Sequence, residues 1–360
     1  MVAYYDRRPL YRSRVGESRC FCDVLPQQLT LLDDPKFYWH LTTWVPVSHQ
    51  TLFEEVTIVP PSAAWSPAEA ELAHAHIEQQ QVSLEQFAGI YFQAMQDAIV
   101  RAWDSERFHL VLHSAGWDTR MMSMALYALY QERGDRWLGN VVFVECANEA
   151  DTARQVIQTI GWDDSLFRVY GDHEAGLNFA TAWQHMDGGM RAYPFNMWWE
   201  VPQWAGAPGD AQCWSAFSGN NAVNSAIQNK LKWSFRTMPE AALSALPLRN
   251  DWIFPFVDLE FMRTLAEWGK GQRPGWCTAD VVRTLSPSVG VIENPSGVRP
   301  VEISDAIFER AVADYQASWY GQLRPDVLPV QRLDYDRWWG HWGLASLCEE
   351  LLAGGYEIDQ

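Results

Sequence analysis

The sequence has 360 residues, of which 48% are hydrophobic, so it is long enough to bury one large core or two ordinary ones. Its 27 Lys and Arg residues against 45 Asp and Glu residues give a formal net charge of −18, which argues against nucleic acid and anionic membranes as partners, since both are bound through clustered cations. No window approaches about 18 consecutive apolar residues, and the start, MVAYYDRRPLYRSRV, lacks the apolar segment of a secretory signal, so we expect a cytoplasmic globular protein.

The first 65 residues are expected to form short strands and turns. This region ends in TIVPPSAAWSP, where Pro60 and Pro61 enforce an extended chain and mark a boundary. We therefore expect residues 1–65 and 66–360 to form separate units.

The six cysteines do not have the density of a disulfide framework. Cys20 and Cys22 stand two residues apart in what we interpret as a strand, an arrangement that could begin a metal site. Ordinary packed thiols are the favoured interpretation, because no second Cys or His pair stands at zinc-ligand spacing.

Helix and strand patterns alternate from Ser83 onward. Ser83 and Gln86 form a capping box that opens a helix with one apolar face. The apolar run over 108–113 does not alternate with polar residues, which is typical of a central parallel strand covered on both faces. The elements expected next are a helix after Thr119 that ends near Gly134, a strand over 140–146, a helix stopped by Gly161 and a strand over 166–170. This spacing predicts an α/β fold with a doubly wound parallel sheet, a short N-terminal β segment and a helical C-terminal part.

The turn after the first of these strands carries the candidate site. Ligands of open parallel sheets bind beyond the carboxyl ends of strands, and the small residues Ala115 and Gly116 allow a ligand to approach the backbone closely. The helix that follows offers N–H groups and a positive dipole end to a phosphate. Asp118 suits Mg²⁺ bridging phosphate oxygens, while Ser114 and Thr119 supply hydroxyl donors. The alternative is that these three side chains only cap the helix, since no Walker pattern is present.

The segments LVLHSAGWDTR, NEADTARQVIQTIG and FPFVDLEFMRTL resemble motifs of the asparagine synthetase family of PP-loop ATP pyrophosphatases, which includes β-lactam synthetase-like members. In this order, they resemble its pyrophosphate-binding loop Ser-Gly-Gly-x-Asp-Ser, the helix after its second strand, and its Pro-Phe-Leu-Asp helix entry. DRRPLYRS and TLFEEVTIVPPSAAW resemble the last strands of the glutaminase domain and its linker. The resemblance implies an adenine nucleotide alpha hydrolase-like ATP-binding domain over 66–360 and a glutaminase remnant over 1–65 without the catalytic cysteine. We therefore expect no glutaminase activity.

The family binds ATP and Mg²⁺, adenylates a carboxylate with release of pyrophosphate, and lets an amine or ammonia displace AMP. By this resemblance, Asp118 is the metal ligand and the turn around it holds the pyrophosphate. His113, Val142 and Phe143 would frame the adenosine. The full set of implied cofactor-binding residues is His113, Ser114, Ala115, Gly116, Trp117, Asp118, Thr119, Val142, Phe143, Ser218 and Gly219.

The sequence also departs from the family pattern. FSGNNAVNSAI stands where the family has Ser-Gly-Glu-Gly-x-Asp-Glu, so Asn220 and Val223 replace acidic residues. In the late loop ENPSGVRPVEI, Arg299 stands near the family's lysine, and we take Asn220 and Arg299 as the candidate catalytic residues. The alternative for Arg299 is a solvated surface arginine. Two hypotheses follow: an amide-forming ligase that joins a small-molecule or peptide carboxylate to an amine or ammonia, or a non-catalytic nucleotide-binding or scaffold protein, with a separate glutaminase or biosynthetic partner possible in either case.

Overall fold

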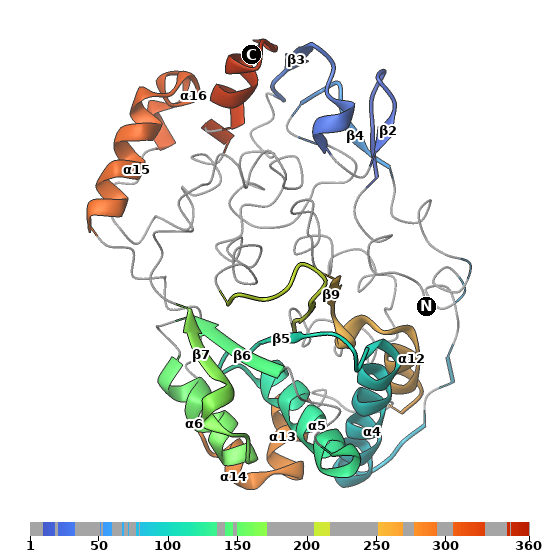
Figure 1. The fold of residues 1–360 in the computed structure, drawn as a ribbon. Coiled ribbons are helices and arrows are strands. Elements are labelled where there is room, and N and C mark those ends of the chain that lie inside the picture. Colours follow the sequence, from blue (N-terminus) through green and yellow to red (C-terminus); the bar gives the residue numbers. More distant parts are fainter. Residues whose placement is uncertain are drawn as a thin grey trace.

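The computed structural model describes residues 10–18, 21–32, 51, 53–59, 67, 71, 77–78, 80–134, 141–146, 150–170, 205–216, 251–268, 277–293, 305–327, 344–345 and 347–359. The buried side chains of these residues form two hydrophobic cores. One surrounds a five-stranded sheet, and the other joins segments from near the two ends of the chain (Figure 1). None of the described helices has the length and apolar character needed to cross a membrane.

The sheet is parallel throughout, and its strand order reverses beside β5. Its strands, in chain order, are β5 (His109–Leu112), β6 (Val141–Cys146), β7 (Phe167–Tyr170), β8 (Gln212–Trp214) and β9 (Asp251–Ile253). In space they lie in the order β7-β6-β5-β8-β9. Thus β5 has parallel neighbours on both sides, with Val111 aligned with Phe143 of β6 and with Trp214 of β8. The expected α/β class, its parallel sheet and the central place of the 108–113 strand are confirmed, whereas β8 and β9 were not predicted from the sequence.

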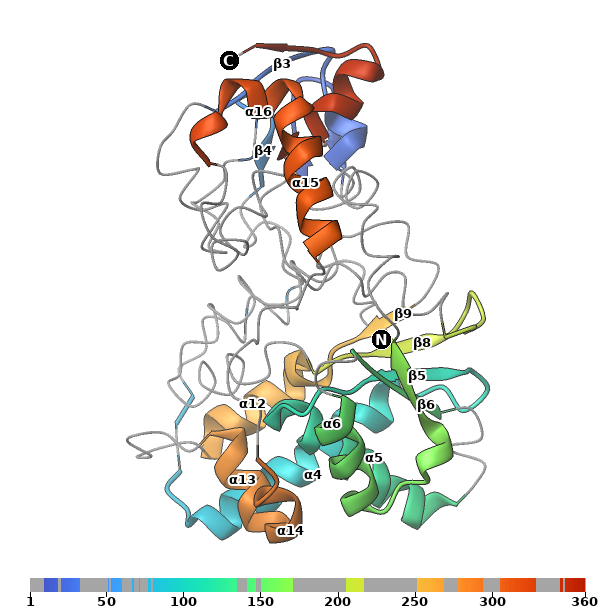
Figure 2. The ribbon, with the colours of Figure 1, turned by 90° about the vertical axis from the view of Figure 1, so that its left-hand side faces the viewer.

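The described helices of this core cover one side of the sheet. They are α4 (Leu84–Ala102), α5 (Trp117–Arg133), α6 (Ala150–Ile160), α12 (Leu259–Trp268), α13 (Thr278–Leu285) and the short α14 (Pro287–Gly290). Figures 1 and 2 both show them below the strands, and α4 packs against α5, α12 and α13. A doubly wound sheet has helices on both faces. Within the described part of the chain only one face carries helices, so the doubly wound arrangement stays a prediction.

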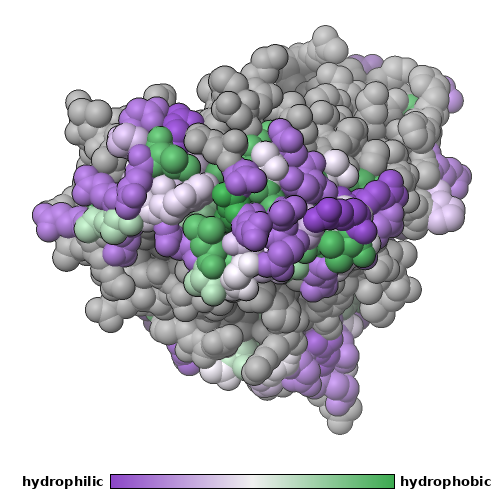
Figure 3. All heavy atoms as spheres, turned by 90° about the horizontal axis from the view of Figure 1, so that it is seen from above, coloured by the Kyte–Doolittle hydropathy of each residue, from purple (hydrophilic) through white to green (hydrophobic). Residues whose placement is uncertain are grey.

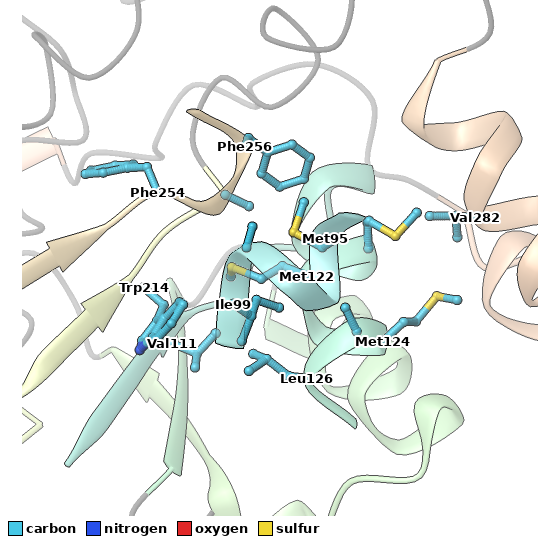
Figure 4. Packing of buried hydrophobic residues seen from close by; sticks show 14 of the residues in the cluster. Met95, Ile99, Val111, Met122, Met124, Leu126, Trp214, Phe254, Phe256 and Val282 are labelled. Atoms are coloured by element: carbon cyan, nitrogen blue, oxygen red, sulfur yellow. The ribbon is translucent and has the colours of Figure 1, made fainter. Parts of the chain in front are cut away.

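Side chains from helices and strands fill the space between these layers. Met95 and Ile99 of α4, Met122 of α5, Val111 of β5 and Trp214 of β8 are all fully buried and lie in one packed region (Figure 4). Unbranched methionines adapt to irregular gaps, which suits an interface where three helices meet a twisted sheet. This packing fixes α5 behind β5, and therefore fixes where the amino end of α5 lies.

The local signals for helix ends behave as the sequence predicts. Ser83 Oγ accepts from the Gln86 N–H at 3.2 Å, and Gln86 Oε1 accepts from the Ser83 N–H at 3.0 Å, so the capping box at the start of α4 is confirmed. Gly134 and Gly161 end α5 and α6 with φ of 78° and 113°. A side chain at Gly161 would be strained in that conformation and would also lie 2.5 Å from Tyr127 Oη.

The second core joins short N-terminal strands to the C-terminal end of the chain. β1 (Tyr11–Arg12), β2 (Glu17–Ser18) and β4 (Thr57–Ile58) form an antiparallel sheet, while β3 (Gln28–Thr30) pairs in parallel with β10 (Glu357–Asp359). Buried Tyr11 and Phe53 share this core with Tyr315 of α15 (Asp305–Ala317), Tyr320 of α16 (Trp319–Leu323) and Leu344. The short strands expected in the first 65 residues are confirmed.

On the face seen from above, the described residues of this unit are mostly hydrophilic and are interrupted by small hydrophobic areas (Figure 3). Val15 and Leu323 are among the large hydrophobic residues that remain exposed. Single exposed apolar side chains of this kind are ordinary on folded proteins and indicate no particular partner.

The expected strand around Cys22 is wrong. Cys22 lies in a 3-10 helix, η2 (Phe21–Val24), because Phe21 and Val24 stand three residues apart and both point into the second core. Cys22 is half-buried. Cys20 lies outside the described residues.

His109 joins β5 to its surroundings at the amino end of the sheet. Its ring stacks on Trp103, with centroids 3.5 Å apart, and is almost fully buried. Nδ1 accepts from Trp214 Nε1 at 3.0 Å, and Nε2 donates to the Asp104 carbonyl at 2.9 Å. The ring is therefore neutral, because a second proton would face the indole N–H. Burial is the main cause that lowers the pKa of His109 to about 4.

We expect acidification to destabilise the protein through His109. In the unfolded chain this histidine has its ordinary pKa of 6.5 and takes up a proton that the folded protein, with a pKa of about 4, does not. The stabilisation is fully present above pH 6.5 and is lost as the pH falls towards 4. Linkage gives a loss of about 2 kcal/mol in the free energy of unfolding between about pH 7 and about pH 5.

Urea unfolding of the wild type and of His109→Asn at both pH values measures this contribution. The asparagine side chain keeps an acceptor for Trp214 but does not titrate, so the variant should lose less stability on acidification. An equal loss in both proteins would show that His109 is not responsible.

Candidate functional site

The loop between β5 and α5 lies where the carboxyl end of the central strand meets a helix N-terminus. α5 begins at Trp117, so the prediction of a helix starting after Thr119 is wrong: Asp118 and Thr119 lie in its first turn. The helix starts early because Gly116 has the extended conformation of an N-cap (φ −66°, ψ 156°) and its carbonyl accepts from the Arg120 N–H at 3.1 Å. For brevity we call residues 114–119 the 114–119 loop, although residues 117–119 form the first turn of α5.

Two hydroxyl groups hold this loop in shape. Thr119 Oγ1 donates to the carbonyls of Ser114 (2.5 Å) and Gly116 (2.8 Å), and Ser114 Oγ accepts from the Gly116 N–H at 3.1 Å. The two hydroxyl oxygens are 3.3 Å apart. Ser114 and Thr119 thus bind main-chain groups of the loop, but neither is the N-cap of the helix: that position is Gly116, and α5 has no side-chain cap hydrogen bond. A Cβ on Gly116 would lie 3.0 Å from Ser114 Oγ, so a larger residue here would have to displace that hydroxyl slightly.

The loop residues differ in exposure. His113 and Ala115 are fully buried, and Thr119 is nearly so. Ser114, Gly116, Trp117 and Asp118 are half-buried and form the accessible part of the loop.

The carboxylate of Asp118 is turned partly into the protein. One of its oxygens, Oδ1, is buried. The pKa of Tyr91, on α4, is raised well above 10. Burial of the hydroxyl is the main cause, and the negative charge of Asp118 is the next. The Tyr91 hydroxyl lies 3.1 Å from Thr278 Oγ1 of α13, so polar groups of three helices gather behind the loop.

His113 lies beneath the loop as a neutral side chain. Its Nδ1 is 3.1 Å from Ser123 Oγ, and its ring meets the ring of Phe143 edge to face at 6.1 Å. Burial, followed by the charge of Arg120, lowers the pKa of His113 to about 3. It therefore supplies no positive charge to a bound anion at neutral pH.

Val142 and Phe143 lie within β6 and not at its carboxyl end. Val142 is aligned with Leu110, and Phe143, which is aligned with Val111, is fully buried. The adenosine contacts implied for these two residues and for His113 stay predictions.

Arg120 was missed by the sequence analysis. Its side chain is fully buried and donates to four main-chain carbonyls: Nε to Ala115 (2.8 Å), Nη1 to Val289 (3.0 Å) and Ile292 (2.8 Å), and Nη2 to Glu293 (3.1 Å). Burial, followed by the nearby charge of Arg283, lowers the pKa of Arg120 to about 10, so it remains a cation at neutral pH. In the sequence, Arg120 is the single charged residue of the stretch RMMSMAL, and this isolation could have indicated a buried cation.

Trp117 lies close to two guanidinium groups. The Cζ atoms of Arg120 and of Arg283, on α13, lie 4.3 Å and 4.7 Å from the centroid of its ring. Such contacts are favourable because the face of the indole ring is electron-rich. They place two positive charges beside the amino end of α5.

Other predicted site residues lie outside the described residues. They are Ser218, Gly219, Asn220 and Arg299, together with Val223 of the segment FSGNNAVNSAI, which we call the second motif. Along the sequence, the described residues after β8 end at Ala216, just before the second motif, and those after α14 end at Glu293, where the late loop begins.

The chain matches no protein-family model, and no curated protein matches it.

We expect Thr119→Val to destabilise the loop and the protein. The two side chains have nearly the same shape, but valine cannot donate to the Ser114 and Gly116 carbonyls. Loss of a partly buried hydrogen bond of this kind costs about 1–2 kcal/mol. Urea unfolding measures the change, and Thr119→Ser, which keeps the hydroxyl, should recover most of it. If valine and serine behave alike, the hydroxyl does not hold the loop.

Proposed function

We propose that the chain binds ATP with Mg²⁺ at the carboxyl edge of the parallel sheet and uses it to form amide bonds. The observation that carries this proposal is the adjacency of β5 and β8 where the strand order reverses, since open α/β sheets bind ligands at that point. The 114–119 loop follows β5, and β8 ends at Trp214, shortly before the second motif begins at Phe217. The strand order also supports a doubly wound, adenine nucleotide alpha hydrolase-like sheet.

The loop has the chemistry to receive phosphate groups. The first N–H groups of α5 have no acceptors within the helix, the helix dipole is positive at this end, and Arg120 and Arg283 add positive charge. These features support binding of a compact anion by an acidic protein.

The residues present also fit Mg²⁺ bound together with the nucleotide. Within the described part of the chain no group of three or more His, Cys, Asp and Glu side chains forms a metal site of its own. Mg²⁺ is often held by one or two carboxylates, phosphate oxygens and water, so Asp118 is sufficient as the side-chain ligand from this loop. When bound, Mg²⁺ would neutralise charge on the phosphate oxygens.

In the proposed reaction, a substrate carboxylate oxygen attacks the α-phosphorus of ATP and pyrophosphate leaves, which gives an acyl-adenylate. The nitrogen of an amine or ammonia then attacks the acyl carbon, AMP leaves, and the nitrogen loses a proton. The 114–119 loop would hold the leaving pyrophosphate, while Arg299 and Asn220 are proposed to act on the reacting groups. The acid is a small molecule or peptide, and the location is cytoplasmic, where ATP is available.

Asn220 and Val223 favour a second candidate function. Neither side chain supplies the carboxylate that the resembled family has in its second motif. A chain that binds nucleotide without turnover, as a scaffold beside a separate glutaminase or biosynthetic partner, would tolerate these residues. Exchange of labelled pyrophosphate into ATP in the presence of candidate acids separates the two functions, because only the ligase catalyses it.

We expect Asp118→Asn to weaken binding of Mg²⁺–ATP by about tenfold to a hundredfold, the scale of a charge-assisted contact. Without Mg²⁺ the same substitution should leave ATP binding unchanged or tighten it, because it removes a negative charge near the phosphates. Calorimetric titration with ATP, with Mg²⁺ and with a chelator, measures both effects.

Asp97→Asn is a matched control, since Asp97 is an exposed carboxylate on α4. It removes the same charge without touching the loop and should leave both affinities unchanged. Equal Mg²⁺–ATP affinity in the wild type and Asp118→Asn would contradict the metal role of Asp118. Failure of the wild type to bind ATP at all would contradict the proposed function.

A further inference from the structure

Arg120 joins two parts of the chain that are far apart in sequence. Through Nε it bonds to Ala115 in the 114–119 loop, and through its two terminal nitrogens it bonds to Val289, Ile292 and Glu293. We call residues 289–293 the 289–293 segment. Its last residue, Glu293, is also the first residue of the late loop that contains Arg299.

The chemistry of these bonds makes the connection hard to break at one end only. A buried guanidinium that loses an acceptor keeps its charge and gains an unsatisfied donor, which is costly in a low-dielectric interior. Its donors are fixed in one plane, so a shift of the 289–293 segment must either move the guanidinium or break several bonds together. Displacement of the 289–293 segment therefore also disturbs the 114–119 loop, and the reverse holds as well.

We propose that Arg120 is a positioning residue that makes the 114–119 loop and the 289–293 segment open and close as one unit. When a ligand is bound at the 114–119 loop, Arg120 would hold the 289–293 segment in place. The connection itself rests on the hydrogen bonds of Arg120, and only its response to ATP rests on the proposed function.

Arg283 provides a contrast within the same cluster. It also lies against Trp117 and carries the same charge, but its guanidinium is half-exposed and lies 3.6 Å from the carboxylate of Asp280 on its own helix. Substitution of Arg283 therefore removes a cation from beside Trp117 while leaving the four bonds of Arg120 in place.

Hydrogen exchange in increasing urea, without ligand, tests the connection. The reporting amides are those of Gly116 and Arg120 in and after the loop, and those of Gly290 and Val291, which donate to Ser286 and Pro287. In the wild type we expect both groups to open with the same urea dependence, as one cooperative unit. In Arg120→Met, Gly290 and Val291 should exchange about tenfold faster or more and with their own urea dependence, whereas Arg283→Met should keep the wild-type pattern.

A residue with only a structural role would not produce this pattern, because its loss would speed exchange in both groups while they still opened together. That outcome, or independent opening already in the wild type, would overturn the proposal. If Arg120→Met does not fold, Arg120→Lys gives the test: it keeps the charge but loses the Nε donor to Ala115, so partial uncoupling is expected. Unchanged coupling in the lysine variant would overturn the proposal.

The same measurement with ATP and Mg²⁺ gives a second readout. In the wild type, ATP should slow exchange at Gly116 and also at Gly290 and Val291, while in Arg120→Met it should slow exchange at Gly116 only. Equal protection of both groups in the variant would overturn the proposal. If ATP protects neither group in the wild type, the proposed nucleotide function fails, and the measurement without ligand still decides whether Arg120 connects the two segments.

Discussion

The pairing of β5 with a parallel neighbour on each side is the constraint on which the candidate site depends. A central strand uses its main-chain groups in both ladders, so its backbone becomes available to a ligand only beyond its carboxyl end. The strand order reverses between β5 and β8, and the chain segments that follow these two strands start side by side. Gly116 and the amino end of α5 occupy this position, and the packing of α4 and α5 behind the sheet holds them there.

The distribution of charge explains how an acidic chain can offer a place to an anion. The net charge of −18 describes the whole sequence, whereas a bound phosphate responds mainly to charges within a few ångströms. Near the 114–119 loop the cations Arg120 and Arg283 meet Trp117, and the dipole of α5 adds to their field. Burial of Arg120 reduces the screening of its charge by water and salt. Its four carbonyl partners offset the cost of removing it from water.

The second core shows how segments too short to be stable alone form a sheet. Strands of two or three residues, such as β1 and β3, gain little from their own hydrogen bonds and depend on apolar packing. Here Tyr11 and Phe53 pack with Tyr315 and Tyr320 from more than 250 residues later, and β10 pairs with β3. The proline boundary near residue 60 is a property of the local chain, and it gives no information about this distant partner.

The sequence by itself determined the elements whose signals lie within one or two turns of the chain. The capping box at Ser83, the stops at Gly134 and Gly161 and the apolar run of β5 are local patterns, because capping and periodicity depend only on near neighbours. Tertiary structure alone decided the strand order, the strands β8 and β9, and the partners of Arg120. Those partners are main-chain carbonyls up to 173 positions away. Every residue carries such a carbonyl, so no pattern of side chains marks which of them the folded chain will bring to a buried guanidinium.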